Sequence, residues 1–367
     1  MNVLISPNAF KGTMSAQEAG GIIQDFLASK FPKVQSQLLP IADGGDGTCD
    51  LLTRNLGVEQ RQAWSLDPYG RPISCTYGWD LHEEKAYIDV SEASGIAILG
   101  NEKKDPYIAS TYGTGILVRD AVALGAKEIV LGLGGSATID LGIGILANLG
   151  VIFLDENGRE LTYFSPNFLS RIRHIQKSPN IPPVRFTCLC DVKNMFFGDN
   201  GAIPVFGPQK GLLDNHFQTY LASCEEVIAQ VYKKQKKNFV DQPGFGAAGG
   251  IAVGLSAFFD TTIEFGASYF FKKVKIVEKV KWADVIITGE GRYDSQSAEG
   301  KACFELLQLA LHQSKKVVLI TSGIEKADEK FDQVLRLPDL DFSKQDFKES
   351  SRKNLITLLE REFLLDV

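Results

Sequence analysis

The chain has 367 residues, of which 44% are hydrophobic and 23% are charged, and its formal net charge is -6 at pH 7. This length and apolar content allow a large buried core and are more typical of two domains than of one. The negative net charge provides no overall basic field, which argues against nucleic acid as a partner. No apolar run is long enough to span a bilayer, and the first residues lack the pattern of a secretory signal, so we expect a cytoplasmic protein without a membrane partner.

Cysteine and histidine usage narrows the possible chemistry. The six cysteines are scattered without CxxC spacing, which favours reduced thiols that lie mostly in the core. Only four histidines are present, and none belongs to a metal-binding motif. We therefore expect any catalysis to depend on carboxylates, lysines and backbone N–H groups. The sequence is compatible with a monomer or a homodimer.

The first predicted strand is the apolar run at residues 3–5, and a polar loop follows it. This loop contains Asn8 and Lys11, and the capping-box pair Ser15 and Glu18 predicts a helix after it. Loops that follow strands form the ligand-binding edge of open α/β sheets, so Lys11 is a candidate cation at such an edge. A solvated surface lysine would give the same local pattern.

The second predicted strand, at residues 34–39, leads into the phrase PIADGGDGT. In this phrase Asp43 and Asp46 bracket Gly44 and Gly45, ahead of a predicted helix. A solvated turn also uses aspartate and glycine. Three glycines and two aspartates in five positions exceed what turning requires, so we interpret the phrase as a functional loop.

A glycine-rich turn follows the buried strand predicted at residues 129–133. Gly134 and Gly135 lack side chains that would keep a backbone away from a phosphate, and Ser136 and Thr138 add hydroxyl donors. A helical apolar pattern comes next, and N–H groups at a helix start favour anions. A tight turn that needs glycine only for its backbone angles is an equally good interpretation. The turn matches neither the GxxxxGK[ST] nor the GxGxxG motif.

Two later strands end in charged residues. The strand at residues 184–190 delivers Asp191, where a carboxylate is well placed for a metal or a substrate hydroxyl. Lys210 then lies on a turn between glycines and prolines. The buried strand at residues 284–288 leads into a loop rich in charge, which is typical of a catalytic edge. The charged residues of that loop are Glu290, Arg292, Asp294 and Lys301.

The distribution of these patterns predicts two domains. Alternating strands and helices occur near both ends of the chain, whereas the middle is richer in strands. We therefore predict one discontinuous domain built from residues 1–61 and 283–367, with a second domain inserted at residues 62–282.

Taken together, eight phrases of the sequence resemble the bacterial type I glycerate kinases over roughly residues 2–325. One such phrase would be a weak signal, but eight in the same order are specific. The phrases are PNAFKGTMSAQE, PIADGGDGT, STYGTG, GLGGSATIDLGIG, CDVKN, GAIPVFGPQKG, GFGAAGG and DVIITGEGRYDSQSAEGK.

The resemblance implies both a fold and a reaction. The implied fold is α/β with two domains, a flavodoxin-like doubly wound parallel sheet and an inserted restriction-endonuclease-like α/β domain. The implied reaction is transfer of the γ-phosphate of ATP to D-glycerate with Mg²⁺, usually at the C2 hydroxyl. The chain departs from the family pattern in two motifs, because the family usually has Asp at Asn8 and Asn-Asp-Gly where this chain has Ile139-Asp140-Leu141. We therefore treat Asn8 as a substrate hydrogen-bonding residue and look for the base elsewhere.

Phosphoryl transfer needs cations and a metal on the phosphates, and a carboxylate near the attacking hydroxyl. We expect Asp191 to be the catalytic base, with Asp294 as the second candidate. Mg²⁺ would be held through water by carboxylates from Asp191, Glu290 and Asp294, because hard oxygen ligands suit this ion. The residues expected to hold the ATP phosphates are Gly134, Gly135, Ser136 and Thr138.

D-glycerate carries a carboxylate that needs a cation. The candidates for this cation are Lys11, Lys210 and Arg292, and we count Lys11 among the catalytic residues. The remaining residues of the expected substrate site are Asn8, Asp43, Gly44 and Gly45.

Three other functions compete with this interpretation. GLGGSA also resembles the phosphate loop of the galactokinase and mevalonate kinase superfamily, but the accompanying N-terminal motifs are missing. A dehydrogenase is disfavoured because no GxGxxG opens a strand–helix–strand unit. A sugar-acid sensor that binds without turnover would not need the charged loop after Thr288. Phosphorylation at C3 instead of C2 is the alternative within the kinase interpretation.

Overall fold

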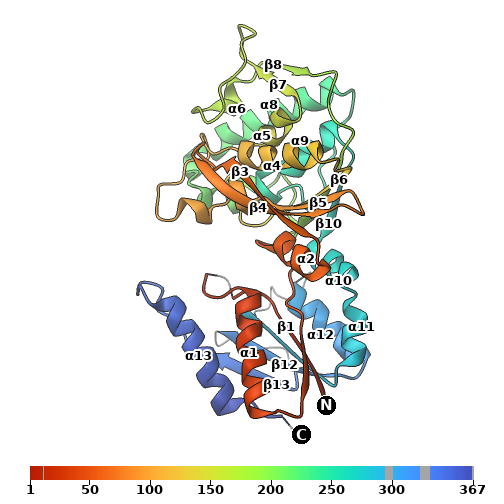
Figure 1. Ribbon diagram of the computed structural model, residues 1–367. Coiled ribbons are helices and arrows are strands. Elements are labelled where there is room, and N and C mark those ends of the chain that lie inside the picture. Colours follow the sequence, from red (N-terminus) through yellow and green to blue (C-terminus); the bar gives the residue numbers. More distant parts are fainter. Residues whose placement is uncertain (11, 294–300, 323–330, 366–367) are drawn as a thin grey trace. The chain divides into compact units, whose positions relative to one another are not determined.

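The computed structural model describes residues 1–10, 12–293, 301–322 and 331–365 (Figure 1). The chain divides into two compact units. Unit 1 consists of Met1–Asp43 and Ala267–Val367, and unit 2 consists of Gly44–Gly266.

These boundaries differ from the predicted ones. The predicted boundary after residue 61 falls inside strand β3 (Glu59–Leu66) of unit 2, and the predicted boundary after residue 282 falls at the end of helix α11 (Ile276–Trp282) of unit 1. The reason lies partly in helix α2 (Thr48–Leu56), which packs against three strands of unit 2. From sequence alone, this helix continues the strand–helix alternation of the N-terminus.

Unit 1 contains a five-stranded sheet in the order β13-β12-β11-β1-β2, and every neighbouring pair is parallel. Numbered along the chain, this order is 2-1-3-4-5, as in flavodoxin. All five carboxyl ends therefore lie at one edge of the sheet. The strands are β1 (Asn2–Pro7), β2 (Gln35–Leu38), β11 (Val285–Arg292), β12 (Lys316–Ser322) and β13 (Gln333–Leu337).

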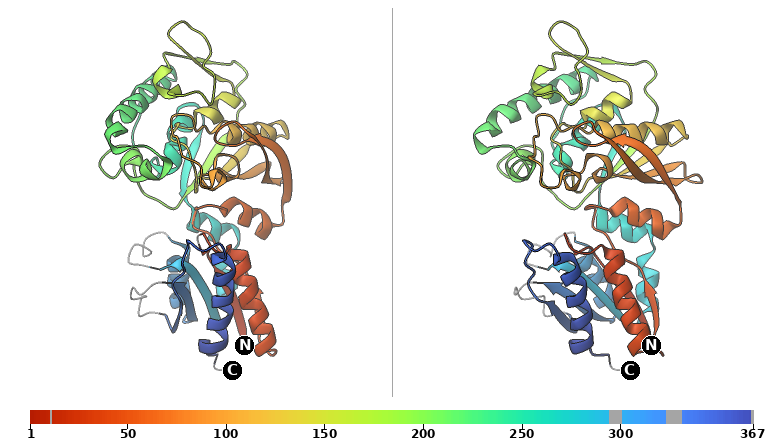
Figure 2. Two further views of the ribbon diagram at one scale, coloured as in Figure 1. Left: turned by 90° about the vertical axis from the view of Figure 1, so that its left-hand side faces the viewer. Right: turned by 60° about the vertical axis from the view of Figure 1, so that its left-hand side comes forward.

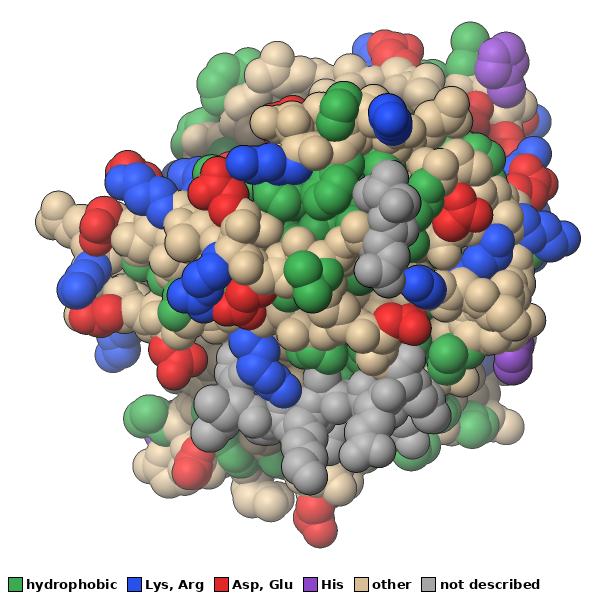
Figure 3. All heavy atoms as spheres, turned by 90° about the horizontal axis from the view of Figure 1, so that it is seen from below, with side chains coloured by type: hydrophobic (Ala, Val, Ile, Leu, Met, Phe, Trp, Pro, Cys, Tyr) green, Lys and Arg blue, Asp and Glu red, His purple; other side chains and the backbone are tan. Residues whose placement is uncertain are grey.

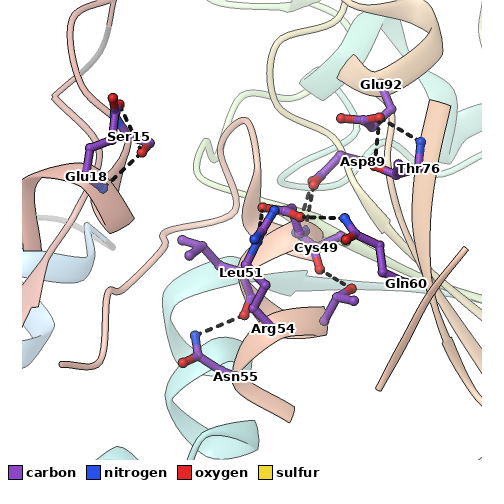
Figure 4. A network of polar contacts seen from close by, with 12 residues as sticks. Ser15, Glu18, Cys49, Leu51, Arg54, Asn55, Gln60, Thr76, Asp89 and Glu92 are labelled. Atoms are coloured by element: carbon purple, nitrogen blue, oxygen red, sulfur yellow. Dashed lines mark hydrogen bonds and ion pairs between the residues drawn. The ribbon is translucent and has the colours of Figure 1, made fainter. Parts of the chain in front are cut away.

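Helices cover both faces of this sheet (Figures 1 and 2). Helix α1 (Ala16–Lys30) packs with α13 (Phe347–Glu362), and α11 packs with α12 (Ala302–His312). The predicted capping box of α1 is confirmed, because Ser15 Oγ accepts from the Glu18 N–H and Glu18 Oε2 accepts from the Ser15 N–H (Figure 4). Buried strands with helices on both faces read as continuous apolar runs.

Unit 2 contains a six-stranded mixed sheet in the order β10-β9-β6-β5-β4-β3. The strands β5, β6, β9 and β10 are parallel to one another, and β3 and β4 add an antiparallel hairpin. The strands other than β3 are β4 (Pro72–Asp80), β5 (Lys85–Asp89), β6 (Glu128–Gly132), β9 (Arg185–Cys190) and β10 (Thr261–Phe265). The carboxyl ends of β5, β6 and β9 thus place Asp89, Gly132 and Cys190 at one edge.

The helices of unit 2 also lie on two faces of its sheet. Figure 1 shows α2 on one face and α4, α5 and α9 on the other. The helices on the second face, and α8, are α4 (Tyr112–Ala123), α5 (Ile143–Asn148), α8 (Phe217–Lys234) and α9 (Ile251–Phe258). The shorter elements are α3 (Ser91–Ser94), α6 (Phe168–Arg171), α7 (Ala202–Phe206) and the hairpin of β7 (Val151–Leu154) and β8 (His174–Lys177). Single 3₁₀ turns occur at Ala97–Leu99, Pro208–Lys210, Asp214–His216 and Ala247–Gly249, and helix α10 spans Gly266–Lys273.

Three further features of the structure concern membrane-spanning helices, surface charge and the cysteines. No helix within the described part of the chain is long and apolar enough to cross a membrane. Acidic and basic side chains are interspersed on the face drawn in Figure 3. All six cysteines are buried free thiols, which confirms the expectation that they lie in the core.

Candidate active site

A cavity of about 460 Å³ lies at the carboxyl edge of the unit 1 sheet. It is lined by Asn8 after β1, by Glu290 and Arg292 of β11, by Ser322 at the end of β12 and by Leu337 at the end of β13. Strands β1 and β11 are the neighbours at which the strand order reverses, and open α/β sheets bind their ligands at this point. The structure therefore brings four predicted site residues to the expected edge, namely Asn8, Asp43, Glu290 and Arg292.

The polar lining of this cavity is held by Asn8. Its Nδ2 donates to Asp43 Oδ2 at 3.1 Å, its Oδ1 accepts from the Ala9 N–H at 2.8 Å, and its own N–H donates to the Gly289 carbonyl at 2.7 Å. Asn8, Asp43 and Glu290 are only 7%, 5% and 6% exposed. An amide cannot take a proton as a carboxylate does, and the Asn8 side chain is hydrogen-bonded to Asp43.

The same cavity fits a magnesium ion that arrives with a phosphate ligand. Asp43 and Glu290 both line it and supply the hard oxygen atoms that Mg²⁺ prefers. In proteins this ion is often bound by one or two carboxylates together with substrate phosphates. Among the described residues, no group of three or more His, Cys, Asp or Glu side chains is placed to hold a metal by itself. Of the predicted metal ligands, Asp191 belongs to unit 2, and Asp294, like Lys11, lies outside the described residues.

Three predicted motifs of unit 2 pack directly on one another. A Cβ added to Gly44 would lie 2.6 Å from the carbonyl carbon of Cys190, the residue before Asp191. A Cβ added to Gly134 would lie 2.3 Å from the Asp46 nitrogen and from the Gly45 carbonyl carbon. Real Cβ atoms do not approach backbone so closely, so glycine is required for these contacts. The GGDG loop, the GLGGSA turn and the end of β9 therefore form one packed cluster.

The GLGGSA turn does not lead directly into a helix, which corrects the prediction for this region. Its backbone pairs with residues 94–96, because the Ala137 N–H donates to the Ser94 carbonyl and the Ile96 N–H donates to the Gly135 carbonyl, both at 2.8 Å. Helix α5 starts only at Ile143. Leu141 and Gly142 precede it with φ angles of 56° and 71°, and two successive left-handed residues delay the helix. Thus Gly134–Thr138 do not provide the N–H groups of a helix start.

Lys210 lies behind the same turn. Its Nζ donates at 2.8 Å to both Ser136 Oγ and the Thr138 carbonyl, and the residue is 3% exposed. Burial lowers the pKa of Lys210 to about 7, and the charge of Asp140 opposes this shift. The sequence predicts a contact with a substrate carboxylate, which stays a prediction, and the structure shows that the Lys210 side chain hydrogen-bonds to the turn. The chain positions that this lysine joins are far apart, which is why the local sequence does not reveal the contact.

Replacing Lys210 with methionine is expected to remove a pH-dependent part of the stability. The folded protein lowers the pKa of Lys210 from 10.5 to about 7, so between these values the unfolded chain binds more protons. The wild type therefore gains stability as the pH rises through this window, and the methionine variant lacks this gain. Urea denaturation at pH 7 and at about pH 9 measures the unfolding free energy of both proteins. The unfolding free energy of the wild type, relative to that of the variant, should be larger at pH 9 than at pH 7. A difference that is constant with pH would show that Lys210 does not titrate in this range.

Asp89, at the end of β5, is a buried carboxylate that sequence reasoning missed. Its Oδ1 accepts from the Cys49 N–H at 3.1 Å and its Oδ2 accepts from the Asp50 N–H at 2.9 Å (Figure 4). These N–H groups belong to the first turn of α2, which follows the GGDG loop. Burial raises the pKa of Asp89 to about 7. In the sequence, Asp89 could have been noticed as an acidic residue that ends an apolar strand. In the structure, its side chain fixes the start of α2 and thereby the GGDG loop before it.

Comparison with known proteins decides the family. The model of the glycerate kinase family matches residues 3–362. The chain belongs to the glycerate kinase family. The Glycerate 2-kinase of Escherichia coli (strain K12) is 34% identical over 88% of this chain and 86% of its own length. The Glycerate kinase of Halalkalibacterium halodurans is also 34% identical, over 88% of this chain and 85% of its own length.

A solved structure of the same family confirms the fold class. The crystal structure of a putative glycerate kinase 2 from Salmonella typhimurium LT2 aligns with a TM-score of 0.82 and 27% sequence identity. The alignment covers 98% of this chain and 96% of that chain. The mixed α/β fold, the membership in the glycerate kinase family and the identity as a kinase are thereby confirmed. The residues of the candidate site described above belong to such an enzyme.

Proposed function

We propose that the chain transfers the γ-phosphate of ATP to the C2 hydroxyl of D-glycerate, giving 2-phospho-D-glycerate and ADP. Membership in the glycerate kinase family supports the substrate, and the name of the Escherichia coli relative, Glycerate 2-kinase, supports the C2 position. The observation that carries the proposal is the unit 1 cavity, where three carboxylates and two cations line one site. These residues are Asp43, Glu290, Asp339, Arg292 and Lys301.

The proposed roles follow from charge. Arg292 would bind the glycerate carboxylate, because a planar guanidinium matches a carboxylate with two parallel hydrogen bonds. Asp43 and Glu290 would hold Mg²⁺, which supplies neutralisation of the phosphate charge during transfer. Asp191 remains our proposed base, and Lys11 our proposed further catalytic cation.

For the fold, we propose a specific type for each unit within the α/β class. We propose that unit 1 is a flavodoxin-like domain and unit 2 a restriction-endonuclease-like domain. The strand order 2-1-3-4-5 and the helices on both faces support the first assignment. The mixed sheet of unit 2, with an antiparallel hairpin beside parallel strands, is compatible with the second.

The reaction is tested by the dependence of ADP release on the acceptor. With ATP and Mg²⁺ present, adding D-glycerate is expected to cause continuous ADP release, measured with a pyruvate kinase and lactate dehydrogenase couple. Glycerol is the control, because it keeps the hydroxyls but lacks the carboxylate that Arg292 is proposed to bind. Binding of D-glycerate without any ADP release would instead establish a sugar-acid sensor and would contradict the proposal.

A further inference from the structure

We propose that the unit 1 cavity is the nucleotide site, with the purine base against an apolar wall of the cavity and the phosphates at Lys301 and the start of α12. This inference rests on the proposed kinase function, and it concerns a different question, namely which unit binds the nucleotide. It replaces the expectation that the phosphates lie on Gly134–Thr138 of unit 2.

The cavity has a large apolar wall. This wall is formed by Phe10, Leu337, Pro338, Leu340 and Phe342. The Phe342 side chain is 62% exposed, and its ring lies 5.5 Å from that of Phe347 between centroids. D-glycerate has two hydroxyls and a carboxylate, so it offers no surface that would match such a wall. A purine base has two flat faces that stack on aromatic side chains.

The cavity also has a cation and a helix start for a triphosphate. Lys301 lines it and is the N-cap residue of α12, an 11-residue helix, while Arg292 stays the residue proposed for the glycerate carboxylate. The Lys301 side chain makes no capping hydrogen bond, and the N–H groups of a first helical turn attract phosphate. Asp43, Glu290 and Asp339 would repel phosphate oxygens on their own, and a Mg²⁺ ion held by Asp43 and Glu290 would offset this repulsion.

The volumes of the described cavities favour the same assignment. Small-molecule sites measure about 300–1,000 Å³, and the unit 1 cavity of about 460 Å³ lies in this range. The pocket of unit 2 beside Ser110 and Asp140 measures about 80 Å³. A groove of about 730 Å³ lies at the starts of β6 and β9, opposite the carboxyl edge at which α/β sheets bind ligands.

The packing of the GLGGSA turn explains why it is not needed as a phosphate cradle. The Gly134 backbone is in contact with Gly45 and Asp46, and Ser136 Oγ accepts from Lys210. These contacts give both the glycines and the serine a structural use. The turn thus supports the GGDG loop, and the nucleotide has its site in unit 1.

The inference is tested by titrating ATP into the protein without glycerate. Phe342→Ala is expected to raise the Kd for ATP about 5- to 100-fold, because base stacking on an aromatic ring is lost. The affinity for inorganic tripolyphosphate, which has no base, should not change. Lys301→Met should weaken both ligands. The control is Trp64→Ala, since Trp64 is an aromatic residue of unit 2 that is 75% exposed.

An unchanged Kd for ATP in the Phe342→Ala variant would overturn the inference. Labelling of the wild type with 8-azido-ATP gives a second readout that needs no variant. We expect the labelled peptide to contain residues 337–342, whereas a label at residues 106–112 or 163–170 would place the base in unit 2. If ATP binding depends on Phe342 but D-glycerate causes no ADP release, the inference holds and the proposed function fails.

Discussion

Asp191→Asn is expected to lower kcat by about 10²- to 10⁴-fold, the range for loss of a general base. Asparagine has the same size and still accepts a hydrogen bond, but it cannot take the proton of the attacking hydroxyl. Asp191 follows β9 directly, is half-buried, and comes after the Cys190 backbone against which Gly44 packs. Initial-rate kinetics with saturating ATP and D-glycerate measure the effect. The affinity for ATP, titrated separately, should change little.

The matched control for this variant is Asp199→Asn, which removes an exposed carboxylate from the same unit. The control should keep the wild-type kcat, and both variants should unfold at the wild-type urea concentration. If Asp191→Asn retains near-full kcat, another carboxylate is the base, and Asp294 is the next candidate.

Gly134→Ala is expected to reduce both stability and activity strongly. The new Cβ would lie 2.3 Å from two backbone atoms of the GGDG loop, and backbone cannot yield as a flexible side chain does. Overpacking of this kind costs about 1–3 kcal/mol. The GGDG loop follows Asp43 in the chain, so its displacement should also disturb the unit 1 cavity. We expect kcat/KM to fall at least about 10-fold, since about 1.4 kcal/mol of lost transition-state stabilisation is enough for this change.

Gly21→Ala in helix α1 is the control for this substitution. A Cβ at Gly21 meets no atom within 4 Å, and the residue lies inside a helix. Alanine there should stabilise the protein by about 0.5–1 kcal/mol without changing the kinetics. Wild-type stability and kinetics in Gly134→Ala would show that the two loops do not need their close contact.

The positions of the buried strands could be predicted from the sequence. The apolar runs at residues 3–5, 129–133, 184–190 and 284–288 correspond to β1, β6, β9 and β11. Each is covered by helices, so nearly every residue is apolar, and runs of this kind are easily recognised. The charged residues at the carboxyl end of β11 therefore mark the sheet edge of unit 1 at which the cavity lies.

Interruptions by left-handed residues could not be predicted. A small, apolar run such as residues 245–259 is typical of one buried helix, but Ala248 with φ 49° and Gly250 with φ 83° divide it into a 3₁₀ turn and α9. Leu141 adopts φ 56°, which leucine rarely does. The resemblance implies glycine at this position in the family, and glycine would avoid the strain. In this chain Ile139 and Leu141 are buried in the core, which accounts for two apolar residues where the family is usually polar or glycine.

The hydrogen-bond partners of individual polar side chains also could not be predicted from the sequence. Lys210 and Ser136 are 74 positions apart, and Asp89 and Cys49 are 40 positions apart, yet each pair forms a buried hydrogen bond. A charged residue on a loop indicates that a site is near. Whether it faces a ligand or another loop depends on long-range packing, and the structure shows Lys210 hydrogen-bonded to the GLGGSA turn.

The most direct test of the central claim is the identity of the product formed from ATP, Mg²⁺ and D-glycerate. The reaction mixture is supplied with enolase but no phosphoglycerate mutase, and phosphoenolpyruvate is followed by its ultraviolet absorbance. We predict an immediate signal, because enolase accepts 2-phosphoglycerate without isomerisation. A signal that appears only after mutase is added would show phosphorylation at C3 and would contradict the proposed reaction.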